Sequence, residues 1–235
     1  YVSDGMSDDG TREIIKKLSA AHPNIHLLDN EKRTTPYALN LGIHAANNFD
    51  ILIILGAHAE IAKDYIQLCE YTLKKYPAAG CVGGLIVNVN EDAASEAIGL
   101  AMSSSFGVGN AHFRTGTKSG YVDTVAFGAY RKEVFEKIGL FDEALTRNQD
   151  DEFNFRLTKA GYKIILDPEI RAKYYVRADY SKLFRQYYQY GLWKVYVNRK
   201  HKAVTSLRQL VPPVFVLFLF SILLIPVFAL FTTYG

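Results

Sequence analysis

The chain has 235 residues, of which 49% are hydrophobic and 22% are charged, and its formal net charge is +3. This length is sufficient for one α/β domain with a sizeable core, and so small a net charge argues against nucleic acid as a partner. Two cysteines, Cys69 and Cys81, are too few for a disulfide framework, so we expect them to be core thiols in a reducing compartment.

Residues 1–167 alternate short apolar strands with helical patterns, which predicts an α/β fold whose mostly parallel sheet carries helices on both faces. Because the chain opens on an apparent strand end and without a methionine, we expect a further strand and helix upstream. Residues 88–121, rich in serine and glycine, fit a binding lid and a plain surface excursion equally well. The expected strands are 1–3, 25–28, 50–55, 81–87 and 122–125, and the expected helices are 11–21, 36–46 with Thr35 as its N-cap, 64–75, 132–138 and 150–160.

The C-terminal part differs in composition from the preceding domain, which we expect to span residues 1–180. Residues 181–209 mix aromatic and basic side chains, typical of an amphipathic helix and basic linker at a membrane–water interface; a solvent-facing helix packed on the domain is the alternative. Residues 210–235 contain no charged residue and exceed the about 20 residues that a transmembrane helix needs. We predict a membrane span there, with a buried core helix or hairpin as the alternative, and the preceding basic residues predict a cytoplasmic domain.

A carboxylate-rich turn follows the first expected strand. Asp4 stands at the strand end, where it can accept hydrogen bonds from a nucleobase or a ribose hydroxyl. Asp8 and Asp9 directly precede the expected helix and are more simply explained by helix capping. The turn therefore predicts Asp4 as a ligand contact.

The apolar run at 50–55 turns abruptly small and polar at Gly56, Ala57 and His58. In an open α/β sheet, ligands bind beyond the carboxyl ends of strands, where these residues would lie. An enzyme that expels a diphosphate has to neutralise its charge, which Mg²⁺ or Mn²⁺ does with oxygen ligands that an imidazole can complete. His58 is therefore a candidate metal ligand and Glu60 a weaker one, with a structural histidine as the alternative.

Three successive carboxylates, Asp150, Asp151 and Glu152, begin the helix expected at 150–160. They suit the helix dipole, and that could be their whole purpose. Clustered like charges also raise the pKa of one carboxyl, as a general base requires. Further along, Arg185 and Gln186 could clamp a diphosphate or a lipid-linked acceptor, although Arg185 could equally reach lipid headgroups.

Taken in order, these features resemble the family 2 glycosyltransferases of the GT-A fold, and most closely the membrane-attached, succinoglycan-biosynthesis type of bacterial polysaccharide enzymes. The likeness covers nearly the whole chain and keeps the order and spacing of the motifs. The matching segments are residues 4–11, 57–60, 122–124, 139–143, 148–152 with 156–157, and 185–187, followed by the apolar tail.

The resemblance implies inverting transfer of a sugar from a nucleotide-sugar donor to a lipid-linked or growing saccharide, at the bacterial inner membrane and in contact with its lipid. It implies Asp150 as the catalytic base and a divalent metal, Mg²⁺ or Mn²⁺, with His58 as a ligand. The residues that it implies for nucleotide-sugar binding are Asp4, Arg33, Asp151, Glu152, Arg185 and Gln186.

The sequence departs from the family pattern at Gly56, where an acidic residue usually holds the metal. Because Mg²⁺ and Mn²⁺ depend on anionic oxygen, this change is expected to weaken metal binding. The alternative function is a degenerate, non-catalytic glycosyltransferase-like membrane protein that binds saccharide or partner proteins. A nucleotidyltransferase is less consistent with the chain, since no phosphate-cradling glycine loop with a lysine is present.

Overall fold

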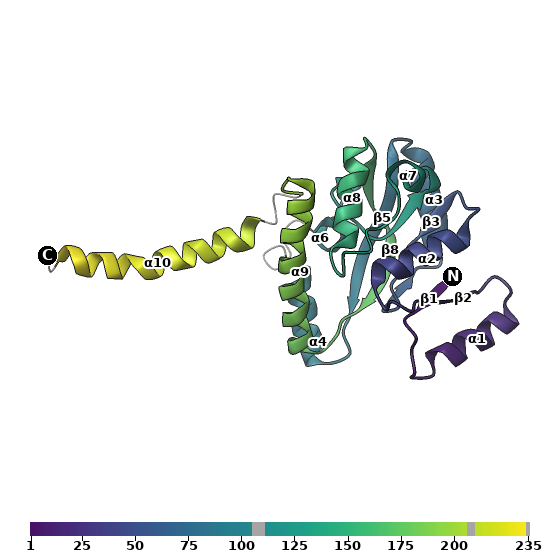
Figure 1. Cartoon of the computed structure of the whole chain (residues 1–235), viewed down its shortest axis with the longest axis horizontal. Coiled ribbons are helices and arrows are strands. Elements are labelled where there is room, and N and C mark those ends of the chain that lie inside the picture. Colours follow the sequence, from purple (N-terminus) through teal and green to yellow (C-terminus); the bar gives the residue numbers. More distant parts are fainter. Residues whose placement is uncertain (105–110, 206–209, 234–235) are drawn as a thin grey trace.

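The structure, a computed structural model, describes residues 1–104, 111–205 and 210–233, with side chains in the last range described as far as Leu224. Figure 1 shows helices arranged around a main sheet, a separate strand pair near the N-terminus, and a C-terminal helix that extends away from the domain. The candidate site residues lie on the N-terminal strand pair, on the main sheet and on the helices beside it.

The N-terminal segment forms a parallel strand pair joined by one helix and followed by another: β1 (Val2–Asp4), α1 (Thr11–Ala21), β2 (Leu27–Asp29) and α2 (Thr35–Ala46). The register of β1 and β2 sets Asp4 opposite Asp29 at the carboxyl ends of both strands. Gly10, with a φ of 89°, precedes α1 in a left-handed conformation that glycine adopts without steric strain. The helix predicted at 11–21 is confirmed, and the one predicted at 36–46 begins one residue earlier, at Thr35, with Thr34 in place of Thr35 as its N-cap.

The main sheet has the strand order β3-β7-β5-β8-β4, and β6 also pairs with β8. Its strands are β3 (Ile51–Ile53), β4 (Ala59–Ile61), β5 (Ala79–Val89), β6 (Gly120–Val122), β7 (Ala126–Arg131) and β8 (Lys163–Tyr175). β5 and β8 run parallel, whereas the pairs β3–β7, β5–β7, β4–β8 and β6–β8 are antiparallel. The prediction of a mostly parallel sheet is therefore wrong, because this sheet is mixed.

The physical reason lies in short strands that the apolar pattern did not separate. β4 and β6 have three residues each, too few for an alternating pattern to stand out. The strand predicted at 122–125 falls mostly in the gap between β6 and β7. Because the apolar pattern did not separate β7 from β6, it predicted parallel strands joined by crossover connections. The chain instead reverses direction, and β7 runs antiparallel to its neighbours.

Helices cover both faces of the main sheet, as predicted. Along β5 and β8, Cys81 and Ile164 join the core beneath α7 (Lys132–Ile138) and α8 (Gln149–Lys159), whereas Val82 and Ile165 join Cys69 in the core beneath α3 (Tyr65–Lys75). Since successive side chains of a strand point to opposite faces, this alternation places apolar cores on both sides. Both cysteines are buried free thiols. The remaining helices are α4 (Ala93–Ser103), α6 (His112–Thr115), α9 (Tyr180–His201) and α10 (Val211–Thr233).

Gly84 lies where β5 passes so close to β8 that no side chain fits. A Cβ atom on Gly84 would lie 1.7 Å from the carbonyl oxygen of Ile170. Because alanine would force the two strands apart, Gly84→Ala is expected to lower the free energy of unfolding by about 1–3 kcal/mol or more. Gly120→Ala, where nothing lies within 4 Å of the added atom, is the control. Equal urea midpoints for the two variants would contradict this expectation.

The C-terminal helices differ in how they relate to the domain (Figure 1): α9 packs along it, and α10 extends away from it. α9 covers residues 180–201, so a helix lies in the segment 181–209, and its place at a membrane interface stays a prediction. Among the described residues, no helix combines the length and the apolarity needed to cross a membrane. The span predicted at 210–235 is therefore not supported.

Candidate active site

The carboxylates Asp150, Asp151 and Glu152 form the first turn of α8, next to the positive end of its dipole. Two side chains of this helix, Phe153 and Leu157, are fully buried and anchor it in the core. The apolar face of α8 thus begins directly after the acidic turn. This packing fixes where the three carboxylates can lie.

Contacts from α9 hold the same turn from the other side. Asn148, the left-handed residue that precedes α8, donates a hydrogen bond of 2.9 Å from its Nδ2 to the carbonyl oxygen of Tyr190. One turn further along α9, the ammonium of Lys194 forms an ion pair with Asp151. Asp151 therefore joins the two helices.

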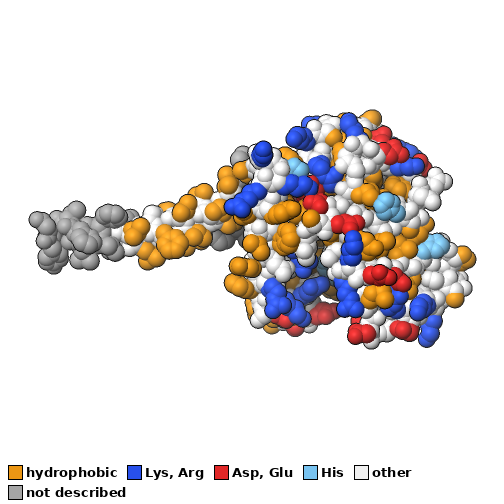
Figure 2. Space-filling view, viewed as in Figure 1, with side chains coloured by type: hydrophobic (Ala, Val, Ile, Leu, Met, Phe, Trp, Pro, Cys, Tyr) orange, Lys and Arg blue, Asp and Glu red, His pale blue; other side chains and the backbone are white. Residues whose placement is uncertain are grey.

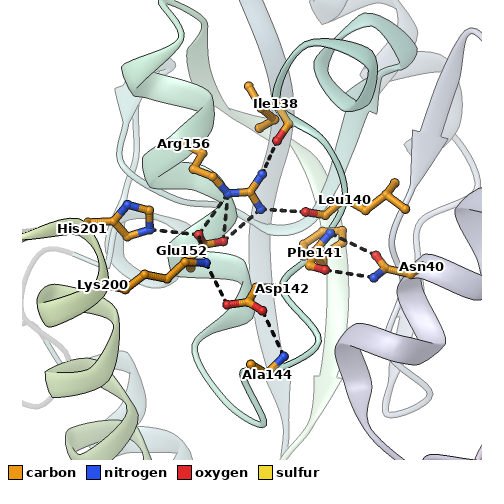
Figure 3. A network of polar contacts seen from close by, with 10 residues as sticks. All are labelled: Asn40, Ile138, Leu140, Phe141, Asp142, Ala144, Glu152, Arg156, Lys200 and His201. Atoms are coloured by element: carbon orange, nitrogen blue, oxygen red, sulfur yellow. Dashed lines mark hydrogen bonds and ion pairs between the residues drawn. The ribbon is translucent and has the colours of Figure 1, made fainter.

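Glu152 lies at the centre of a buried polar network, drawn in Figure 3. Its fully buried carboxylate accepts from the guanidinium of Arg156 at 2.9 and 3.0 Å. From α9, Lys200 donates to Oε1 of Glu152 at 3.0 Å, and Nε2 of His201 lies 2.9 Å from the same oxygen. Lys200 also contacts Asp142 at 2.8 Å. One carboxylate thereby links α8, α9 and the loop between α7 and α8.

The environment of Glu152 favours its ionised form. Burial alone would raise the pKa of this carboxyl, but the hydrogen bonds and charge of Arg156, together with Lys200 and His201, outweigh burial and hold it below its usual value. With these partners, Glu152 and Asp151 already have structural roles in joining the helices. Their predicted contact with a nucleotide sugar stays a prediction.

Asp150 differs from its two neighbours because it is free to act on a ligand. The residue lies at the surface, and among the described residues no side chain forms a hydrogen bond or ion pair with its carboxylate, on which only the backbone N–H groups of its own turn and the charge of Lys194 act favourably. Surrounding protein desolvates the carboxyl and Asp151 adds a like charge, which together raise the pKa of Asp150 to about 6. A carboxyl poised near neutral pH suits general-base catalysis.

At the other end of the chain, Asp4 is held by its own loop. Its carboxylate accepts from the backbone N–H of Ser7 at 2.9 Å, the hydroxyl of Ser7 at 2.7 Å and the guanidinium of Arg12 at 3.0 Å. Burial would raise the pKa of Asp4, but these hydrogen bonds lower it overall. Asp4 thus lies at the predicted strand end as an ionised, already hydrogen-bonded group.

The structure adds Asp29 as a candidate that the sequence reasoning missed. Arg12 bridges from Asp4 to Asp29 with a contact of 2.6 Å, and the Asp29 side chain remains 54% exposed. Arg33, predicted to bind nucleotide, follows β2 with a φ of 53° and lies against Gly5 of the Asp4 loop. The sequence did contain a signal for Asp29: it is a carboxylate at the end of the strand next to β1, where ligands of a parallel sheet bind.

His58 is held among aromatic rings rather than carboxylates. Its ring lies edge-on to Tyr174 with centroids 4.7 Å apart, and to Phe127 at 6.4 Å. The ring also fills the space beside Gly56, where a Cβ atom would lie 2.7 Å from Cε1 of His58. Burial, and then the charge of Arg177, lower the pKa of His58. His58 is therefore a half-buried imidazole that disfavours protonation.

The donor set around His58 does not fit Mg²⁺ or Mn²⁺. Among the described residues, no group of three histidine, cysteine or acidic side chains could hold a metal ion. Glu60, the weaker candidate, instead accepts from Lys173 at 3.2 Å and from the hydroxyl of Tyr175 at 3.1 Å. Since these hard cations need several oxygen ligands, the predicted metal ligand His58 has no visible set of co-ligands.

The predicted pair Arg185 and Gln186 separates onto two sides of α9. Gln186 donates to the hydroxyl of Tyr190 at 2.8 Å and lines a small pocket with Tyr174 and Arg177. Arg185 lies on the outer face of the helix, in a hollow with exposed Phe184. Gln186 therefore belongs with the His58 region, and Arg185 does not.

Solved glycosyltransferases share this fold. A structure of S. aureus TarS, residues 1–349, matches with a TM-score of 0.57 and 16% identity over 83% of this chain and 54% of that one. GalNAc-T7, crystallised with UDP, GalNAc and Mn²⁺, matches with a TM-score of 0.55 and 16% identity over 73% of this chain and 36% of that one. The predicted α/β fold of GT-A type is confirmed by these likenesses, with the mixed sheet described above.

Two relatives are similar in sequence. The succinoglycan biosynthesis protein ExoA of Rhizobium meliloti (strain 1021) is 33% identical over 214 residues, or 90% of this chain and 64% of that protein. The dolichyl N-acetyl-alpha-D-glucosaminyl phosphate 3-beta-D-2,3-diacetamido-2,3-dideoxy-beta-D-glucuronosyltransferase of Methanococcus voltae is 35% identical over 206 residues, or 85% and 64%. The chain thus spans 64% of the length of each relative.

A family model decides the assignment. Residues 1–139, well over half of the chain, match the model described as Glycosyl transferase family 2. The match includes β1 with Asp4 and the loop with His58, and it ends before the acidic turn of α8. Together with the relatives and the fold, it shows that the chain belongs to glycosyl transferase family 2.

Proposed function

We propose that this protein transfers a sugar from a nucleotide-sugar donor to a lipid-linked or growing saccharide in bacterial polysaccharide synthesis, with inversion at the anomeric carbon. The observation that carries the proposal is Asp150, an exposed carboxylate with a pKa of about 6, in a chain of this family. Its two acidic neighbours are held by partners on α8 and α9, which leaves Asp150 as the base.

In this proposal the reaction is a single displacement. Asp150 takes the proton from an acceptor hydroxyl as its oxygen forms a bond to the anomeric carbon. The bond from that carbon to the diphosphate oxygen breaks at the same time, and the nucleoside diphosphate leaves with the bonding electrons. Attack from the side opposite the leaving group inverts the anomeric centre. Asp29 and Asp4, at the ends of β2 and β1, are the candidates for contacts with the nucleoside.

The names of the relatives support the class of acceptor. ExoA is a succinoglycan biosynthesis protein, and the Methanococcus voltae enzyme acts on a dolichyl-linked sugar phosphate. A dolichyl carrier is a lipid, so the second name supports a lipid-linked acceptor, and the first supports a growing polysaccharide. The donor is proposed to be a nucleotide sugar, in keeping with the UDP bound to GalNAc-T7.

We also propose that the domain works at the cytoplasmic face of the bacterial inner membrane, with α9 against the lipid. Figure 2 shows hydrophobic side chains along the described part of α10 and on the outer face of α9. On α9, Phe184 is 75% exposed, Tyr188 64% and Leu192 59%. Rings of this kind, with Lys182 and Arg185 beside them, suit the headgroup region of a bilayer.

A transfer assay tests the proposed function. The full-length protein, incubated with radiolabelled UDP- and GDP-sugars and a bacterial lipid extract, is expected to move label into the lipid-soluble fraction. The Asp150→Asn variant provides the background. If the wild-type protein neither transfers label nor releases nucleoside diphosphate from any donor, the degenerate, saccharide-binding alternative is the better account, and Gly56 favours it.

A further inference from the structure

The surroundings of His58 are cationic. Arg177 lies near enough to lower the pKa of His58, and both Arg177 and Tyr174 line the small pocket beside Gln186. A second arginine, Arg114, also lies beside Tyr174, with its guanidinium 5.3 Å from the centre of the Tyr174 ring. A divalent cation placed here would meet two positive charges, whereas an anion would be attracted by both.

Arg114 is a partly buried cation without a counter-charge. Its Nη1 donates to the side-chain oxygen of Asn88 at 3.2 Å, and its guanidinium also lies 5.6 Å from the ring of Phe113. Within the described residues it forms no ion pair. Burial lowers the pKa of Arg114, although the neighbouring tyrosines partly oppose this effect. A guanidinium has five N–H donors, and among the described residues only Nη1 of Arg114 forms a hydrogen bond.

Arg114 and Asp150 border the same region. Tyr190 interacts electrostatically with both: its pKa is raised mainly by burial and also by Asp150, and its ring lies within electrostatic reach of Arg114. Gln186 donates to its hydroxyl. The backbone carbonyl of Tyr190 also accepts a hydrogen bond of 2.9 Å from Asn148, two residues before Asp150, so Tyr190 connects the surroundings of Arg114 with the start of α8.

The acidic residue that lines the small pocket, Asp179, already has hydrogen-bond and ion-pair partners. Asp179 lines the same small pocket, but its carboxylate accepts from the backbone N–H of Lys182 at 2.9 Å as the N-cap of α9. It also lies 3.4 Å from the ammonium of Lys182. The charge of Asp179 is thus offset locally, and the arginine pair keeps the region positive.

We propose that Arg114, assisted by Arg177, binds the departing diphosphate directly, so that nucleotide binding and sugar transfer proceed without a divalent cation. This inference rests on the proposed function and concerns the same site. An arginine can donate two parallel hydrogen bonds to phosphate oxygens and stays charged throughout. Fixed positive charge at the leaving group stabilises the transition state as the bond breaks. The two arginines would thus supply the positive charge that a metal ion would provide if position 56 carried an acidic ligand.

Calorimetric titration of the full-length protein with UDP and with GDP, in EDTA and in Mn²⁺, tests this proposal. At least one nucleotide is expected to bind in EDTA with little gain from Mn²⁺. Arg114→Gln should weaken that binding by about tenfold or more, as expected for loss of hydrogen bonds to a charged group. Arg114→Lys should recover part of the affinity, which a purely structural role for the guanidinium would not predict.

Two further variants separate binding from folding. Arg177→Gln, at an exposed position, should fold normally and show a smaller loss, because solvent screens its charge. Arg171→Gln, on β8 with its Nε bonded to the carbonyl of Pro168 at 3.3 Å, is the matched control and should bind like the wild type. Binding that requires Mn²⁺, or equal affinity of Arg114→Gln and wild type, overturns this inference alone. No nucleotide binding under either condition overturns it together with the proposed function.

Discussion

Replacing Asp150 with asparagine is expected to reduce sugar transfer by about 10²- to 10⁴-fold, the usual contribution of a general base. Asparagine keeps the shape of the side chain but cannot accept the acceptor's proton. Because the carboxyl of Asp150 has no described side-chain partner and its raised pKa means that the folded state disfavours its charge, the variant should unfold at or above the wild-type temperature and bind nucleoside diphosphate with nearly unchanged affinity. Steady-state transfer assays and calorimetric titration measure the two effects separately. A fully active variant would remove Asp150 from its assigned role.

The pH dependence gives a second readout of the same residue. Only the ionised carboxylate acts as a base, and the pKa of Asp150 is about 6, so kcat/KM should rise up to that pH and level off above it. Asp151→Asn is the informative control, because it removes the like charge that helps to raise this pKa. In that variant the rising limb should move to lower pH while activity at pH 8 is retained. An unshifted limb would show that another group controls the profile.

Replacing Glu152 with alanine is expected to lower the free energy of unfolding by about 3–5 kcal/mol, the usual result of removing one partner of a buried ion pair. Arg156, Lys200 and His201 would then face one another without the carboxylate that they share. For a chain of this size the melting temperature should fall by roughly 6–20 °C. Thermal unfolding at pH 7, followed by circular dichroism, measures the change.

Glu70→Ala is the matched control for Glu152→Ala. Glu70 pairs with Lys74 at 2.5 Å, but both side chains are largely exposed, so its loss should change stability by no more than about 0.5 kcal/mol. The pKa of Glu152 lies below its ordinary value of 4.5, so its stabilising contribution is present above that pH and is lost as pH falls through the lowered pKa. The difference between wild type and Glu152→Ala should therefore narrow in acid. Similar losses for the Glu70 and Glu152 variants would contradict the network in Figure 3.

Local signals predicted the helices well, and long-range pairing was the part they missed. α7 covers residues 132–138 and α1 covers residues 11–21, as predicted, because apolar spacing and flanking turn residues define both. The direction of the strands depends on which neighbour each one meets, and nothing local indicated that β7 would lie antiparallel between β3 and β5. The prediction therefore had helices on the correct faces of the sheet but the wrong relative direction for several strands.

The same division holds for the site. Asp150 could be selected because three adjacent carboxylates at a helix start are visible in the sequence. The partners that distinguish Asp150 from Glu152 could not, since Lys200 and His201 lie 48 and 49 positions beyond Glu152. Arg114 was missed for a similar reason: its residue type is common, and only the absence of a described counter-charge beside Tyr174 makes it a candidate.

The ring of His58 beside Gly56 has a consequence for how mutations at this loop combine. Any side chain added at 56 would meet that ring at 2.7 Å, so the imidazole must rotate before the new group can be accommodated. Positions 56 and 58 therefore form one mutational unit, and their substitutions should be non-additive, as contacting residues generally are. Gly56→Asp has to be compared in the wild-type and His58→Ala backgrounds, because a single variant would combine the effect of a new carboxylate with that of a displaced ring.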